Sequence, residues 1–145
     1  MPTAAATPAI EFRDVSFHVG HTQVLTGLNL QVAKGETLVL LGRSGSGKTT
    51  TLKLVNRLVS PTSGEVRVNG IRNTEIDVTL LRRGIGYVIQ DAGLFPHFTV
   101  ERNIGLVPKI EGWPKERIRA RTDELLQLVG LAPEMAGRYP HQLSG

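Results

Sequence analysis

A glycine-rich segment between an apolar run and a helical pattern constrains the fold of this chain more than any other feature. The segment, residues 42–50, reads GRSGSGKTT and matches the pattern G-x-x-x-x-G-K-[ST]. The continuous apolar run 37–41 before it predicts a buried strand, and the spacing of apolar residues in 48–59 predicts an amphipathic helix. A strand, a glycine turn and a helix in this order indicate an α/β domain with a phosphate-binding loop.

The residue types of this loop suit a polyphosphate. Glycines let the backbone bend tightly and approach an anion without a Cβ, and the loop amides then form a nest at the start of a helix. Lys48 can reach the β- and γ-phosphates, the Thr49 hydroxyl can ligate Mg²⁺, and Thr50 can contact the α-phosphate. The residues expected at the nucleotide are Gly42, Arg43, Ser44, Gly45, Ser46, Gly47, Lys48, Thr49 and Thr50. The motif alone leaves kinases, GTPases and ATPases open.

Other strands are predicted on both sides of this loop. They are expected at 10–15, 28–32, 65–68 and 85–89. Asn69-Gly70 follows the third of them and predicts a tight hairpin turn, because both positions tolerate positive φ. Strands therefore dominate the first part of the chain, around one strong helix.

Helices are predicted to dominate the remainder. Thr99 suits an N-cap, Pro114 suits a first helical position, and Gly130 suits a helix stop. The later helix is expected to bury Ile118, Leu125, Leu128 and Val129. The helix after the glycine loop is expected to bury Leu52, Val55, Leu58 and Val59.

Composition excludes several classes of protein. The chain has 145 residues, no cysteine and a formal net charge of +4, so it offers neither a disulfide framework nor a thiolate metal site. No dense basic run is present, and no nucleic-acid partner is expected. The longest apolar run is far too short to span a membrane. Residues 1–8 are expected to form a disordered tail.

Three further stretches narrow the choice when they are taken with the glycine loop. The predicted strand 85–89 ends at Gln90, the sequence DAGLFPHFTV follows in 91–100, and the chain finishes with YPHQLSG in 139–145. Together these motifs resemble the nucleotide-binding domain of an ATP-binding cassette (ABC) transporter, closest to the glycine betaine/proline/choline (osmoprotectant) importer branch. The resemblance implies an antiparallel β subdomain, part of a RecA-like core and the start of a helical subdomain.

The resemblance also assigns roles to single residues. It implies that ATP and Mg²⁺ bind at the glycine loop, with Thr49 and Gln90 at the metal and Gln90 as the Q-loop glutamine. It implies that Leu143, Ser144 and Gly145 begin the signature, which in a head-to-tail dimer approaches the nucleotide held by a second nucleotide-binding subunit. Residues 94–98 are expected either to face the permease or to pack locally under a loop. Val19 occupies the position where the family usually stacks an aromatic ring on adenine, and among nearby aromatics only Phe17 shares its face.

The resemblance sets the expected domain and activity as well. Residues 9–145 are expected to be a nucleotide-binding domain truncated inside the signature, peripheral to the cytoplasmic face of the plasma membrane. The Asp-Glu strand, the catalytic glutamate and the switch histidine of the family lie beyond residue 145, so no complete catalytic set is expected and this chain alone should hydrolyse little ATP. A non-hydrolysing nucleotide-binding remnant is one alternative. A soluble ATPase of DNA maintenance is another, which the short helical segment after Gln90 disfavours.

Overall fold

The computed structural model describes residues 7–90 and 93–143, and the chain forms two compact units. The N-terminal unit is Met1–Tyr87 and the C-terminal unit is Val88–Gly145. Among the described residues, no helix combines the length and the apolar character that crossing a bilayer requires.

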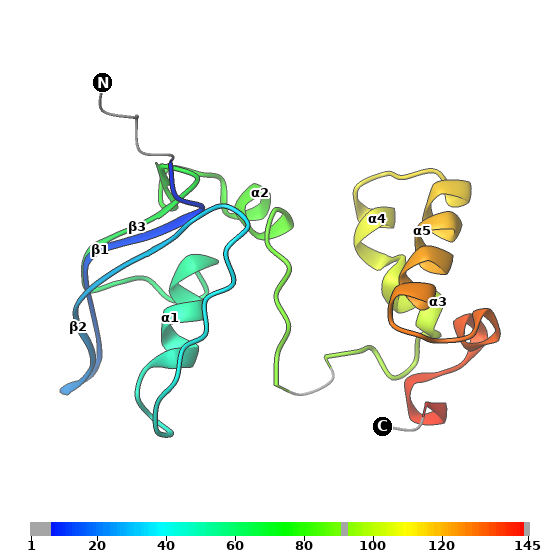
Figure 1. The fold of residues 1–145 in the computed structure, drawn as a ribbon, viewed down its shortest axis with the longest axis horizontal. Helices are drawn as coiled ribbons and strands as arrows, with labels where there is room; N and C mark the ends of the chain where they lie inside the picture. Colours follow the sequence, from blue (N-terminus) through cyan, green and yellow to red (C-terminus); the bar gives the residue numbers. More distant parts are fainter. Residues whose placement is uncertain (1–6, 91–92, 144–145) are drawn as a thin grey trace. The chain divides into compact units, whose positions relative to one another are not determined.

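The N-terminal unit contains a four-stranded antiparallel sheet with the order β2-β1-β3-β4 (Figure 1). Its strands are β1 (Ile10–Val19), β2 (Thr22–Val32), β3 (Ser63–Val68) and β4 (Ile71–Arg72). The strands predicted at 10–15, 28–32 and 65–68 are confirmed, and β1 and β2 are longer than expected. The predicted hairpin turn is also confirmed, since Asn69 has a φ of 51° and Gly70 a φ of 83°.

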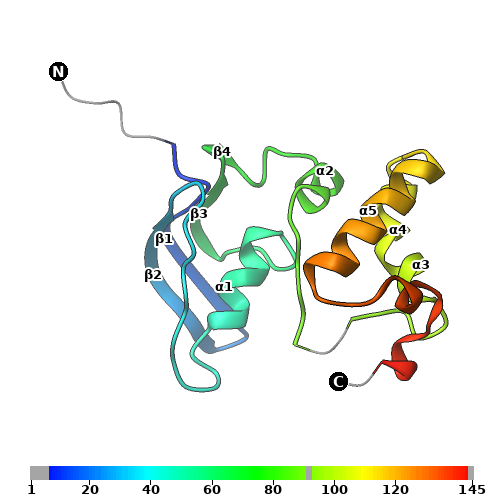
Figure 2. The same ribbon diagram turned by 45° about the vertical axis from the view of Figure 1, so that its right-hand side comes forward.

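The hydrophobic core of this unit lies between the sheet and helix α1 (Lys48–Val55), which follows one face of the sheet in both ribbon views (Figure 2). Phe12, Val15 and Val66 from the sheet pack with Leu54 and Val55 from the helix. A shorter helix, α2 (Val78–Arg83), begins at Asp77, whose carboxylate accepts hydrogen bonds from the amides of Thr79 and Leu80 at 2.9 and 3.0 Å.

Helix α1 differs from its prediction in length and in its buried face. It ends at Val55 rather than residue 59, because Arg57 takes a φ of 54° and the chain turns there. Leu54 is the buried leucine, whereas Leu52 and Leu58 are exposed. Val55 is buried and Val59 packs partly against the core, so the predicted stripe of Leu52, Val55, Leu58 and Val59 is wrong in part.

The two continuous apolar runs do not form strands. Residues 37–41 and 85–89 have no ladder partner among the described strands, and the predicted strand assignment is wrong for both. Their side chains are correspondingly open: Leu41 is 89% exposed and Val88 is 94% exposed. A fully apolar pattern indicates that both faces of a strand need cover, but it does not supply the neighbouring strand whose backbone must pair with it.

The C-terminal unit is helical. Its elements are α3 (Val100–Ile104), α4 (Leu106–Ile110), α5 (Lys115–Leu128), the 3₁₀ turn η1 (Pro133–Gly137) and the 3₁₀ turn η2 (Pro140–Gln142). The N-cap at Thr99 is confirmed, because its hydroxyl accepts from the amide of Arg102 at 3.3 Å. Pro114 is the residue immediately before α5 rather than its first helical residue.

The end of α5 follows a recognised glycine stop. Gly130 has a φ of 73°, its amide donates to the Gln127 carbonyl at 3.1 Å, and the amide of Leu131 donates to the Leu126 carbonyl at 2.8 Å. This pair of bonds is a Schellman motif, so the predicted stop is confirmed. The predicted stripe is wrong at its end, because Leu128 and Val129 are exposed while Leu126 and Thr122 are buried.

Candidate nucleotide-binding site

The glycine loop lies in the N-terminal unit and leads directly into α1. Its last glycine, Gly47, is buried and has a φ of 88°. A Cβ at this position would lie 2.7 Å from Cδ2 of Leu25 and 3.1 Å from the carbonyl oxygen of Val24, both on β2. Glycine is therefore required here twice, once by backbone conformation and once by the close approach of β2.

The lysine of the loop bends back over the loop that precedes it. Its Nζ donates to the carbonyl oxygens of Gly42 and Arg43 at 2.8 and 2.7 Å and to Oγ of Ser46 at 3.3 Å. A Cβ at Gly42 would lie 2.6 Å from Oγ of Ser46, so this end of the loop is also closed around a glycine. The ammonium of Lys48 is thus held at the concave side of the loop.

The main-chain amides of the loop suit an anion. Within the part of the chain that the structure describes, Ser46 is the one residue from Gly42 to Thr49 whose amide donates to a backbone carbonyl, that of Arg43 at 3.2 Å. The first turn of α1 leaves its own amides without intrahelical partners, and the helix dipole places positive charge there. Amides, a helix start and one ammonium together fit a polyphosphate.

Helix α1 is anchored at its start by Thr51. Its amide and its hydroxyl both donate to the carbonyl oxygen of Gly47, at 2.8 and 3.0 Å. Thr51 is buried, while Thr49 two residues earlier is exposed and Thr50 is half-buried. The hydroxyl of Thr49 is therefore on the open side of the first turn, where it can serve as a hard oxygen ligand for Mg²⁺. No group of three or more His, Asp or Glu side chains is arranged for a metal ion within the described ranges.

Val19 lies at the end of β1, beside the turn at Gly20, and is 62% exposed. Phe17 does not share its surroundings, because it packs against the core cluster opposite Leu25. The β1–β2 register shifts between Phe17 and His18, so the simple alternation that placed Phe17 on the face of Val19 is broken. The adenine position predicted at Val19 stays a prediction, and Phe17 is not free to replace it.

The other predicted site residues belong to the C-terminal unit. Gln90 is an exposed residue on a bend, so the predicted metal pair of Thr49 and Gln90 is divided between the two units. Leu143 follows η2 and is half-buried, while Ser144 and Gly145 lie outside the described residues. The roles of Gln90 and of the signature residues stay predictions.

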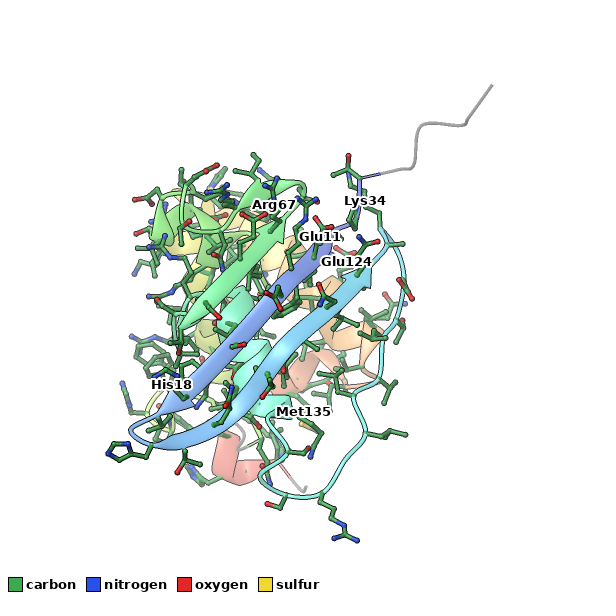
Figure 3. All side chains as sticks on the ribbon, turned by 90° about the vertical axis from the view of Figure 1, so that its left-hand side faces the viewer. Glu11, His18, Lys34, Arg67, Glu124 and Met135 are labelled. Atoms are coloured by element: carbon green, nitrogen blue, oxygen red, sulfur yellow. The ribbon has the colours of Figure 1, made fainter. Side chains whose placement is uncertain are left out.

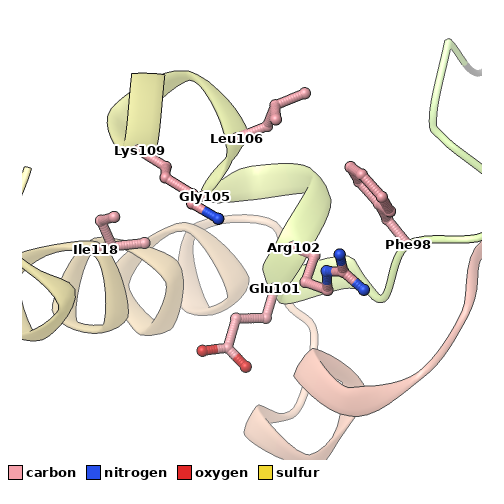
Figure 4. A pocket seen from close by; sticks show the side chains of 7 residues that line it. All are labelled: Phe98, Glu101, Arg102, Gly105, Leu106, Lys109 and Ile118. Atoms are coloured by element: carbon pink, nitrogen blue, oxygen red, sulfur yellow. The ribbon is translucent and has the colours of Figure 1, made fainter. Parts of the chain in front are cut away.

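A second ordered loop, residues 93–99, precedes α3 and carries three rings, and we call it the aromatic loop. The centroid of the His97 ring lies 6.0 Å from that of Phe95 and 4.6 Å from that of Phe98. The guanidinium of Arg102 lies 4.4 Å from the centre of the Phe98 ring. Figure 4 shows Phe98 and Arg102 at one side of a pocket of about 310 Å³, whose lining also includes Lys109.

The sheet residues that alternate with the core residues Phe12 and Val66 carry a charged network set by strand register. Glu11 stands opposite Arg67, and Arg13 stands opposite Glu65, on adjacent strands (Figure 3 labels Glu11 and Arg67). Glu65 accepts from Arg67 at 2.6 Å and from Arg72 at 2.5 Å, and Arg13 contacts Glu11 at 2.9 Å.

These contacts shift the ionisation of both carboxylates. The hydrogen bond from Arg67 lowers the pKa of Glu65, and the hydrogen bond from Arg13 lowers the pKa of Glu11. The same Glu11 contact raises the pKa of Arg13. The network therefore contributes to the stability of the sheet and is separate from the glycine loop.

Two kinds of residue escaped the sequence analysis. Val24 and Leu25 on β2 lie against Gly47 of the glycine loop, and the sequence around them does not indicate this contact. The carboxamide of Asn103 lies within hydrogen-bond distance of four backbone groups of the aromatic loop. A signal existed for Asn103, because asparagine is unfavourable inside a helix unless its side chain finds backbone partners.

Comparison with known proteins identifies relatives that share the glycine loop's family. Residues 25–145 match the family model described as ABC transporter. The chain is 50% identical over 126 residues to the glycine betaine/carnitine/choline transport ATP-binding protein OpuCA of Bacillus subtilis, covering 87% of this chain and 33% of that protein. It is 49% identical to the glycine betaine uptake system ATP-binding protein YehX of Escherichia coli, covering 94% of this chain and 44% of that protein.

Solved structures agree with the sequence comparison. A dimeric structure of MJ0796, a bacterial ABC transporter cassette, superposes with a TM-score of 0.81 at 33% identity, covering 94% of this chain and 63% of that one. A second MJ0796 dimer, in a post-hydrolysis state bound to ADP and Pi, has the same TM-score at 32% identity, covering 93% of this chain and 63% of that one. The α/β fold class expected from the motifs is therefore confirmed, although the chain spans 33% of the length of OpuCA. With its family model, relatives and fold in agreement, this chain belongs to the ABC transporter family.

Proposed function

We propose that this chain is the nucleotide-binding part of the ATP-binding subunit of an osmoprotectant importer. The single observation that carries the proposal is the loop 42–50, in which Lys48 is bonded to the carbonyls of Gly42 and Arg43 and the loop amides other than that of Ser46 donate to no backbone carbonyl among the described residues. The named relatives support the transport role, because OpuCA and YehX are described as ATP-binding proteins for glycine betaine transport or uptake. ATP is the substrate and Mg²⁺ the metal in this proposal.

The loop acts through fixed charges rather than through covalent chemistry. Lys48 would exchange its contacts with the carbonyls of Gly42 and Arg43 for phosphate oxygens, and the loop amides other than that of Ser46 would donate to the same phosphates. Mg²⁺, when bound, neutralises part of the charge that develops on the phosphates. Thr49 would hold that ion by its hydroxyl, and Gln90 would ligate it or orient the attacking water through its carboxamide.

The base is expected to contribute less than the phosphates. An aromatic ring stacked on a base contributes roughly 1–3 kcal/mol, and Val19 offers no ring. Phe17 is committed to the core. The proposal therefore places most of the affinity in the triphosphate, with weak discrimination between ATP and GTP.

The partners follow from the same family. The aromatic loop would meet the permease, because Leu94 and Phe95 are each 46% exposed on a loop that is otherwise held by hydrogen bonds. A second copy of the subunit would supply Ser144 and Gly145 to the phosphates bound at Lys48. In this proposal the protein lies at the cytoplasmic face of the plasma membrane.

Solute uptake tests the transport role directly. Cells that carry the permease and the protein as encoded should accumulate labelled glycine betaine, and Lys48→Ala should abolish the accumulation. Lys53→Ala on the last turn of α1 is the matched control, because it removes the same charge from the same helix without touching the loop. Uptake that survives Lys48→Ala would contradict the proposal, as would a wild-type protein that supports no uptake.

A further inference from the structure

We infer that Asn103 is a positioning residue, whose carboxamide holds the aromatic loop in the shape that the permease must meet. The inference rests on the proposed contact between this loop and the permease. Asn103 is thereby added to the residues that couple nucleotide binding to transport, although it contacts neither the nucleotide nor the permease.

The carboxamide joins three separate points of the loop. Its Oδ1 accepts from the amide of Phe95 at 2.8 Å. Its Nδ2 lies within hydrogen-bond distance of the carbonyls of Phe95 and Phe98, at 3.2 Å each, and of Thr99 at 3.0 Å. One side chain on the helix therefore ties the first ring residue, the last ring residue and the helix cap together.

The chemistry of the contacts fixes which side chain can do this. The Phe95 amide can only donate, so the atom that faces it must be the oxygen, and the nitrogen must then face the carbonyls. Aspartate keeps the acceptor for the Phe95 amide but turns a negative oxygen toward the carbonyls of Phe98 and Thr99. Leucine has a similar shape and no polar atom. Asparagine alone among these satisfies both sides.

The bonded loop presents its apolar side chains in one arrangement. The amide of Phe98 closes a turn onto the carbonyl of Phe95 at 3.0 Å, and Arg102, one residue before Asn103, lies over the Phe98 ring (Figure 4). Leu94 and Phe95 remain exposed beside this cluster. A surface ordered before its partner arrives avoids the entropy cost of ordering it on binding, so loss of the tie should weaken association.

Asn103 lies outside the nucleotide loop. It belongs to the C-terminal unit, and its hydrogen bonds all reach the loop 95–99, whereas the loop 42–50 belongs to the N-terminal unit. A change at Asn103 should therefore separate two properties that a general loss of folding would lower together. These properties are the affinity for Mg·ATP and the affinity for the permease.

The test uses the protein as encoded with its permease in nanodiscs. Asn103→Asp and Asn103→Leu should each weaken permease binding about tenfold at pH 8, because each loses more than one net hydrogen bond. Mg·ATP affinity should stay within about twofold of the wild type. Asn29→Ala is the matched control, since Asn29 also bridges backbone groups through its carboxamide but lies on β2.

The pH dependence of Asn103→Asp separates positioning from simple destabilisation. As the pH falls toward the ordinary aspartate pKa of about 3.9, the carboxyl becomes protonated and can donate one hydrogen bond again, so its defect should shrink, while the Asn103→Leu defect should not. His97 and Arg102 beside the loop are common to both variants, so the difference between the variants reports on the carboxyl. Amide hydrogen exchange at Phe95 should quicken in Asn103→Leu. A wild-type protein that never binds the permease would overturn the proposed function, whereas wild-type permease affinity in both variants would overturn this inference alone.

Discussion

The glycine loop and the aromatic loop both lead into a helix, but they are shaped in opposite ways. The glycine loop takes its shape from its own backbone, with Gly47 at positive φ against β2 and Lys48 bonded to the carbonyls of its own loop. The aromatic loop takes its shape from one side chain, Asn103, which lies beyond the loop on the following helix. The shape of a loop that depends on its own backbone can be predicted from a short sequence motif, whereas the shape of a loop held by a side chain outside it cannot.

The difference also predicts how each loop fails. A loop that takes its shape from its own closely packed backbone has no space for added side-chain atoms, so a larger residue in it should disrupt its conformation most. A loop tied by one side chain should fail when that side chain is removed and should tolerate changes within the loop.

Gly47→Val should have the largest effect, because the new side chain meets Leu25 and the Val24 carbonyl and must also adopt a positive φ. We expect Mg·ATP affinity to fall by about 100-fold or more, which corresponds to roughly 3 kcal/mol. Fluorescent-nucleotide titration measures it. Gly35→Ala is the control, since Gly35 has a φ of 77° with nothing within 4 Å of the added Cβ. If both variants bound nucleotide like the wild type, close approach would not shape the loop.

Asn103→Leu should have the next largest effect, on stability rather than on nucleotide. The carbonyls of Phe98 and Thr99 lose a donor, and we expect the free energy of unfolding of the C-terminal unit to fall by roughly 1–3 kcal/mol. Urea unfolding followed by the fluorescence of Trp113 reports on this unit. An unchanged unfolding midpoint would show that the tie is dispensable.

A double-mutant cycle between Leu25→Ala and Gly47→Ala sharpens the first prediction. Trimming Leu25 removes the nearest atom to the added Cβ but leaves the positive φ in place. The two changes should couple by about 1 kcal/mol in nucleotide affinity, because contacting residues are not additive. Additive effects would mean that the backbone conformation alone accounts for the glycine.

Lowering the pH should reduce the stability of the sheet slightly, through Glu65, and this effect should be the smallest of those predicted. The pKa of Glu65 is lowered from 4.5, so its contribution to stability is present above that value and is lost as the pH falls through the lower pKa of the folded state. Wild-type protein should therefore be more stable than Glu65→Gln at pH 7, and the gap should close toward pH 3. Thermal unfolding across this range measures it. A gap that widened on acidification would contradict the sign.

The sequence predicted the parts of the fold whose information is local. Apolar patterning was enough to locate β1, β2 and β3, and Asn69-Gly70 marked the hairpin after β3, because the two sides of that hairpin lie nearby in the chain. The pattern GRSGSGKTT was enough to place the glycine loop before a helix. Thr99 and Gly130 marked helix ends correctly because capping involves only a few neighbouring residues.

The features that could not be predicted depend on partners far along the chain. Residues 37–41 and 85–89 read as strands, but an apolar run does not specify which strand pairs with it. The end of α1 depends on the positive φ of Arg57, and an arginine in the sequence does not indicate such a φ. The contact of Gly47 with Leu25 and the reach of Asn103 to Phe95 are likewise set by packing.

Calorimetric titration measures the affinity of the protein for Mg·ATP. It therefore tests most directly whether the loop 42–50 binds a triphosphate through its amides, Lys48 and Thr49. We predict saturable uptake of one nucleotide by the wild-type protein and by Lys53→Ala. Lys48→Ala should bind about 10- to 100-fold more weakly, since it loses a charge-assisted contact to phosphate. Absence of heat from the folded wild-type protein, or equal affinity in Lys48→Ala, would contradict the account.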